Sequence, residues 1–176
     1  MLKAILATLA LAPLLLAQDK PADDFGAPGC GDPNAKFEVK TEKAKHPAQA
    51  EAGKALVFFI EDDSDFEMNP RPTTMMGLDG AWVGATHGTS YFYASVDPGA
   101  HHVCANWQKA RLLLNVQKTA ALHFTAEAGG AYYFEARNMW WRDHGGTGRL
   151  TLSPLDSDQG RLLTDTMSFS ISHQKN

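Results

Sequence analysis

The chain has 176 residues, with 16 Lys or Arg against 20 Asp or Glu and a formal net charge of −4 at pH 7. This length suits one domain with its own hydrophobic core, which needs neither a metal nor extensive cross-linking for stability. The acidic balance argues against nucleic acid and against an anionic membrane surface as partners.

The first 17 residues are typical of a cleaved signal peptide. Lys3 supplies a short positive region, and an apolar run from Ala4 to Leu16 precedes the polar residues that start at Gln18. A membrane span needs about 20 apolar residues, so this run predicts a signal and not a transmembrane helix. We expect cleavage near Ala17 and a periplasmic or secreted mature protein. A buried N-terminal helix is the alternative.

Residues 18–52 are rich in Pro, Ala and charged side chains, and we predict an irregular N-terminal arm and linker. Within it, residues 36–40 suit a short edge strand. Only two cysteines are present, Cys30 and Cys104. In an oxidising compartment such a pair predicts a disulfide, which would clamp the arm onto the outer face of the strand that carries Cys104. Two free buried thiols, or half of a metal site, are the alternatives.

Residues 53–176 alternate apolar and polar side chains, which is the pattern of strands with one buried face. Turn signals such as Asp79-Gly80 and Pro98-Gly99 separate them. The fold predicted is all-β, an antiparallel β-sandwich of about eight to ten short strands, because helical segments for βαβ units are missing. The predicted strands are 56–60, 73–78, 81–86, 90–96, 102–107, 112–117, 122–126, 132–136, 150–152 and 167–171, with one helical turn within 156–164.

The acidic run from Glu61 to Glu67 predicts a solvated loop at the end of a strand. Calcium binds clustered carboxylates, but the glycine and ligand spacing of an EF-hand loop are absent. The seven histidines do not form a metal motif either. His101 and His102 are successive residues, whose side chains point to opposite faces of a strand, and His123 falls on the solvated face. We therefore predict no metal and no cofactor, while a zinc site assembled from several strands stays an alternative.

Catalytic motifs are absent: there is no nucleophile elbow, Walker loop, dinucleotide fingerprint or His-Glu-x-x-His segment. We name no catalytic residue. The candidate ligand-binding residues are Trp140 and Trp141, which precede the glycine-containing segment 143–146. One of the two indoles would be exposed and free to stack on a sugar or peptide; the alternative is that both cap the core. Tyr91, Tyr93 and Tyr133 point outward in phase, as a second aromatic patch or as cross-strand pairs.

Several segments together resemble an exported bacterial family catalogued as domain of unknown function 2846. The resemblance rests on Gly53–Ile60, Leu78-Asp79-Gly80 with Val83-Gly84, Ser90-Tyr91-Phe92, Val96–Gly99 before His101, and Glu127–Phe134. It covers roughly residues 53 to 155. It implies a β-sandwich in envelope or lipid-anchored proteins and supplies no catalytic residue. The chain departs from the lipoprotein members because no cysteine directly follows its apolar leader.

These observations favour a non-enzymatic domain of the bacterial envelope that binds a protein, a glycan or a small ligand, or has a structural role. The alternative is a hydrolase or metal-binding protein that uses loop His, Asp and Glu residues. Stacking tryptophans would support the first hypothesis, and a bound stoichiometric metal the second.

Overall fold

The computed structural model describes residues 30–44, 46–108, 116–141 and 147–175, so the predicted signal peptide and the segment 143–146 lie outside it. The described residues form eleven strands and one helix. In chain order these are β1 Phe37–Glu42, β2 Ala55–Phe66, β3 Thr73–Leu78, β4 Ala81–His87, β5 Ser90–Val96, β6 Gly99–Gln108, β7 Val116–Gln117, β8 Thr119–Ala126, β9 Ala131–Trp141, β10 Thr147–Leu155, α1 Ser157–Thr166 and β11 Ser168–Gln174.

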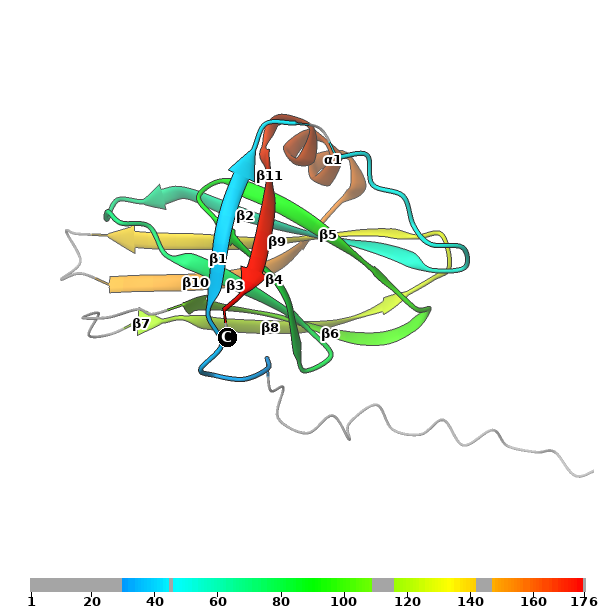
Figure 1. The fold of residues 1–176 in the computed structure, drawn as a ribbon, viewed down its shortest axis with the longest axis horizontal. Coiled ribbons are helices and arrows are strands. Elements are labelled where there is room, and N and C mark those ends of the chain that lie inside the picture. Colours follow the sequence, from blue (N-terminus) through cyan, green and yellow to red (C-terminus); the bar gives the residue numbers. More distant parts are fainter. Residues whose placement is uncertain (1–29, 45, 109–115, 142–146, 176) are drawn as a thin grey trace, which may run out of the picture.

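The strands make two sheets, and the predicted β-sandwich is confirmed. The larger sheet has the order β1-β11-β5-β2-β9-β10-β7, and the smaller has the order β4-β3-β6-β8 (Figure 1). The smaller sheet is antiparallel throughout. The larger sheet is mixed, because β2 runs parallel to β9, β11 to β5, and β7 to β10. The predicted antiparallel arrangement therefore holds for the smaller sheet and not for the larger one.

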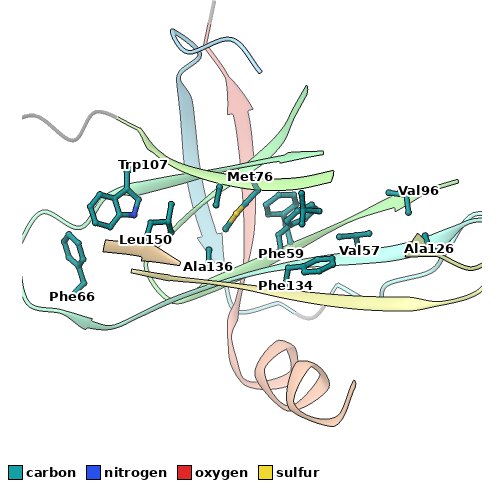
Figure 2. Packing of buried hydrophobic residues seen from close by; sticks show 14 of the residues in the cluster. Val57, Phe59, Phe66, Met76, Val96, Trp107, Ala126, Phe134, Ala136 and Leu150 are labelled. Carbon is teal, nitrogen blue, oxygen red and sulfur yellow. The ribbon is translucent and has the colours of Figure 1, made fainter. Parts of the chain in front are cut away.

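The main core lies between the two sheets. Phe59 and Phe134 rise from the larger sheet toward Met76 of the smaller one (Figure 2). Phe66 and Trp107 close one end of this layer, with ring centroids 5.5 Å apart in an edge-to-face arrangement. Along these strands the side chains point alternately into the core and away from it. The apolar residues that recur at every second position in the sequence are therefore the residues that form the core.

Strands β1 and β11 form a ribbon that closes one side of the sandwich. They pair antiparallel along their whole length, and in Figure 1 they run steeply across β9 and β10. Beyond its short pairing with β5, β11 turns its serines to the edge strand β4. Ser170 Oγ donates to the carbonyl of Ala85 at 2.9 Å, and the N–H of Ala85 donates to Ser172 Oγ at 3.0 Å. Serine hydroxyls thus take the place of a neighbouring strand at this edge.

Two predictions about local structure are wrong. The acidic run 61–67 is not a solvated loop, because β2 continues to Phe66 and the side chains of Glu61 and Asp63 are buried. The helical turn predicted within 156–164 is a ten-residue helix. Asp156 caps it by accepting hydrogen bonds from the N–H groups of Asp158 and Gln159.

Candidate functional site

The outer face of the larger sheet carries the aromatic patch anticipated from the phase of the tyrosines. Phe58 stacks on Tyr133 of β9, with ring centroids 4.6 Å apart, and faces Tyr93 of β5 at 5.8 Å. These rings point outward because their neighbours along the strands, such as Phe59, point into the core. Both predicted arrangements are therefore present: the rings pair across strands and the pairs form one patch.

Helix α1 and the segment 46–50 cover most of this patch. Gly160 lets the helix approach closely: a Cβ built there would lie 2.2 Å from Cγ of Tyr133. Leu163 packs on the same cluster, as do Ala48 and Ala50 from the linker. Because the helix leaves part of the face open, the patch ends in a cleft.

The cleft has a volume of about 470 Å³ and lies between the linker and the last turn of α1. Phe58 and Tyr91 contribute aromatic rings to it. Its lining is His46, Pro47, Ala48, Phe58, Tyr91, Thr164 and Asp165. A concave site with an apolar floor and few polar groups is the usual form of a small-molecule site.

Most hydrogen-bonding groups around the cleft are engaged within the protein. His46 Nε2 is bonded to Glu42 Oε1, and the imidazole stacks on Phe169 with ring centroids 4.0 Å apart. Tyr93 Oη donates to the carbonyl of Pro47 at 3.4 Å, and Thr164 Oγ1 donates to helix carbonyls at 3.1 Å. A ligand rich in hydroxyl groups would thus find few polar partners here.

One wall of the cleft carries an acidic side chain. Asp165 lies in the last turn of α1, where the helix dipole places partial negative charge, and that turn contains no basic residue. Burial raises the pKa of Tyr91, and the nearby Tyr93 and Asp165 raise it further, so its phenol stays neutral. The His46–Glu42 pair adds no net positive charge. This wall of the cleft thus combines an acidic side chain with the negative end of a helix dipole.

The predicted disulfide between Cys30 and Cys104 is present. It fixes residues 30–36 on the outer face of the smaller sheet, as expected from the phase of Cys104. Trp82 Nε1 donates to the carbonyl of Asp32 at 2.9 Å. At Gly77 a Cβ would lie 2.7 Å from Cys104 Sγ and 2.8 Å from the carbonyl oxygen of Cys30, so only glycine admits the arm there.

A second cavity, of about 320 Å³, lies beside this arm. Its lining includes Met75, Asn106, Trp107 and Lys118. The amide of Gln108 borders it and bonds both backbone groups of Phe37, accepting at 2.5 Å and donating at 3.1 Å. These bonds tie the start of β1 to the smaller sheet, which makes this cavity part of the arm's attachment.

The histidines that the structure describes are dispersed over several strands and loops. His101 lies beside Phe124 on the inner side of β6, with ring centroids 5.5 Å apart, and His102 lies beside the exposed His123, so successive residues face opposite ways as predicted. In the part of the chain that the structure describes, no group of three or more His, Cys, Asp or Glu side chains could hold a metal ion.

An Asp–His pair lies at the turn between β3 and β4. His101 Nδ1 is 2.6 Å from Asp79 Oδ2, and His101 Nε2 is 2.7 Å from the carbonyl oxygen of Asp97. Burial lowers the pKa of His101, but the bonds to Asp79 and Asp97 outweigh it and the net shift is upward. With an acceptor at each ring nitrogen, the imidazolium form is favoured and neither nitrogen is placed to act as a general base.

The two tryptophans singled out in the sequence differ in exposure. Trp140 is 8% exposed and belongs to the core beside Phe66, with ring centroids 6.4 Å apart. Trp141 is half-buried. Their predicted role in ligand binding stays a prediction, and of the two only Trp141 offers surface for it. The outer cleft was not singled out in the sequence, because its lining comes from four segments far apart in the chain.

Comparison with protein-family models, curated proteins and solved structures gives no match. The resemblance to domain of unknown function 2846 therefore stays a prediction. Among the described residues, no helix has the length and apolar character needed to span a membrane.

Proposed function

We propose that the mature chain is an exported, non-enzymatic binding domain of the bacterial envelope, and that its ligand occupies the outer cleft. The leader-like residues 1–17 and the Cys30–Cys104 disulfide support an extracytoplasmic location, because disulfides persist in oxidising compartments. The cleft with its aromatic floor is the observation that carries the binding role.

The ligand class follows from the lining. Phe58 and Tyr91 line the cleft with aromatic rings, and aromatic rings attract cations with about 0.5–2 kcal/mol. The C-terminal end of α1, where the helix dipole places partial negative charge, forms one wall. The small ligand expected is an organic ammonium compound with an apolar body. A glycan fits less well, because the polar groups around the cleft are mostly bonded within the protein.

Isothermal titration calorimetry of the mature protein with choline, and with its uncharged carbon analogue, tests this proposal. We expect choline to bind and the neutral analogue to bind several-fold more weakly. Asp165→Asn, at an exposed position, should weaken choline binding several-fold. The matched control is Asp158→Asn, an exposed acidic residue in the first turn of the same helix. Equal binding of the two compounds, or no binding of either, would overturn the proposed ligand class.

The alternative hypothesis, a hydrolase or a metal-binding protein, finds less support. The Asp79–His101 pair has both ring nitrogens engaged, and Thr164 donates its hydroxyl to helix carbonyls. Neither arrangement provides an activated nucleophile.

A further inference from the structure

Two acidic side chains lie together in the interior of the sandwich. Glu61 and Asp63 are two residues apart on β2, so both point to the inward face that also carries Phe59. Each is fully buried, with an exposed fraction of 0%. Such burial is rare for carboxyl groups and costs free energy when they are charged.

Neutral groups from both sheets hold this pair. Thr74 Oγ1 of β3 donates to Glu61 Oε1 at 2.6 Å. Asn138 Nδ2 of β9 lies 2.6 Å from Glu61 Oε1 and 2.6 Å from Asp63 Oδ1. Trp107 Nε1 of β6 donates to Asn138 Oδ1 at 2.6 Å. Because an indole N–H can only donate, this bond orients the amide with its NH₂ toward the carboxyls.

No ion pair balances the two carboxyls within the described part of the chain. The charged or titratable groups that face Asp63 are the exposed Arg71, which precedes β3, and His87 at the end of β4. Glu61 faces the hydroxyls of Thr74 and Thr86, the Asn138 amide and Asp63. Among the described residues, the only charge near Glu61 is therefore negative.

The hydrogen-bond pattern accommodates one proton between the two groups. Glu61 Oε2 and Asp63 Oδ2 have no N–H or hydroxyl partner among the described residues. Because Asn138 Nδ2 lies 2.6 Å from an oxygen of each carboxyl, the two groups are neighbours, and a proton on one of them allows a hydrogen bond between them. Burial raises the pKa of Glu61 well above its usual range, and the charge of Asp63 adds to this. Burial also raises the pKa of Asp63, while Asn138 and Arg71 oppose the rise. Glu61 therefore holds the proton.

We propose that Glu61 and Asp63 form a proton-dependent latch that joins β2 to β3 and β9 and that weakens as the pH rises. Loss of the proton puts two adjacent negative charges into a dry interior, between the layers that the latch connects. Because the folded protein binds this proton more tightly than the unfolded chain, the latch stabilises the fold fully at acid pH. Its contribution is lost as the pH increases toward the raised pKa of Glu61. An exported protein meets the pH of its surroundings, so its rigidity would follow external acidity.

The test compares urea unfolding of the wild-type protein and Glu61→Gln between about pH 5 and about pH 8. In this range, the uptake of one proton by the folded protein changes the equilibrium constant of unfolding by up to tenfold per pH unit. Glutamine reproduces the protonated acid, since its oxygen accepts from Thr74 and its amide donates to Asp63. We expect Glu61→Gln to lose most of the pH dependence. Asp62→Asn, on the same strand but facing outward toward Arg137, should retain it.

Infrared spectroscopy provides a measurement that does not depend on the variant's folding. At a pH where exposed carboxyl groups are ionised, the wild-type protein should still show the C=O band of a buried protonated carboxylic acid, which disappears as the pH is raised further. Absence of this band where exposed carboxyl groups are ionised would overturn the latch. An undiminished pH dependence in folded Glu61→Gln would overturn it as well.

Discussion

Removal of the Cys30–Cys104 bridge tests the role of the arm most directly. The two cysteines are 74 residues apart in sequence, and the chain-entropy relation for a loop of this size gives about 4 kcal/mol of stabilisation. For a domain of this length, each kcal/mol shifts the melting temperature by about 2–4 °C. We therefore expect Cys30→Ala/Cys104→Ala to melt roughly 8–16 °C below the wild-type protein.

Thermal unfolding followed by circular dichroism, without reductant, measures this loss. The two single variants are the matched controls, because either one removes the bridge and each should melt close to the double variant. Wild-type protein that has been fully reduced should behave in the same way. A double variant that melts together with the oxidised wild-type protein would refute the assignment of the bridge as a stabilising clamp.

Three further substitutions test particular contacts by urea unfolding. On an exposed helix, Gly→Ala raises stability by about 1 kcal/mol through helix propensity. At Gly160 the added methyl group would meet the ring of Tyr133 beneath α1, so we expect Gly160→Ala to lower the free energy of unfolding. A higher free energy of unfolding would contradict the docking of the helix. Trp107→Phe keeps a ring in the core but leaves Asn138 Oδ1 without its hydrogen-bond donor, which should lower the free energy of unfolding by about 1–3 kcal/mol. An unchanged free energy of unfolding would argue against this hydrogen bond. Asp79→Asn removes the partner that raises the pKa of His101 from 6.5. The Asp79–His101 pair stabilises the fold fully below pH 6.5, and this stabilisation is lost as the pH rises through the raised pKa of His101. Asp79→Asn should therefore lower the free energy of unfolding more in acid than in alkaline buffer. An equal loss at both pH values would contradict the pairing.

Local signals in the sequence predicted the strands and turns of this fold well. Asp79 and Gly80 have φ angles of 49° and 83°, the pair of positive values that a tight Asp-Gly hairpin turn requires. The phase of Cys104 also predicted the face on which the arm lies, because side chains alternate strictly along β6. These features depend only on residues near one another in the chain.

Strand partners could not be predicted in the same way. The parallel pairing of β2 with β9 joins segments far apart in sequence, and alternation shows which face is buried but not which strand lies alongside. The length of α1 was underestimated for a local reason. Gly160 lowers helix propensity in the middle of the segment, and its purpose, close contact with Tyr133, exists only in the folded protein.

The acidic run shows how tertiary structure overrides composition. Glu61 and Asp63 continue the inward phase of Phe59, yet their charge predicts solvent exposure. Asn138 likewise continues the inward phase of Ala136 on β9. Polar residues in phase with two apolar stripes are the sign of a buried network, but they can be recognised as one network only when the two strands are known to be neighbours.

Strand β2 connects the two proposals made for this protein. Its outward residue Phe58 forms part of the cleft, while its inward residues Glu61 and Asp63 form the proton-dependent latch. Because successive residues of one strand share a rigid backbone, a loosening of the inner contacts acts on the strand beneath the ligand. The two proposals nevertheless fail independently: Asp165→Asn affects the cleft without touching the core, and Glu61→Gln affects the core without touching the cleft. A pH dependence of ligand binding that disappears in Glu61→Gln would show that the strand transmits the change.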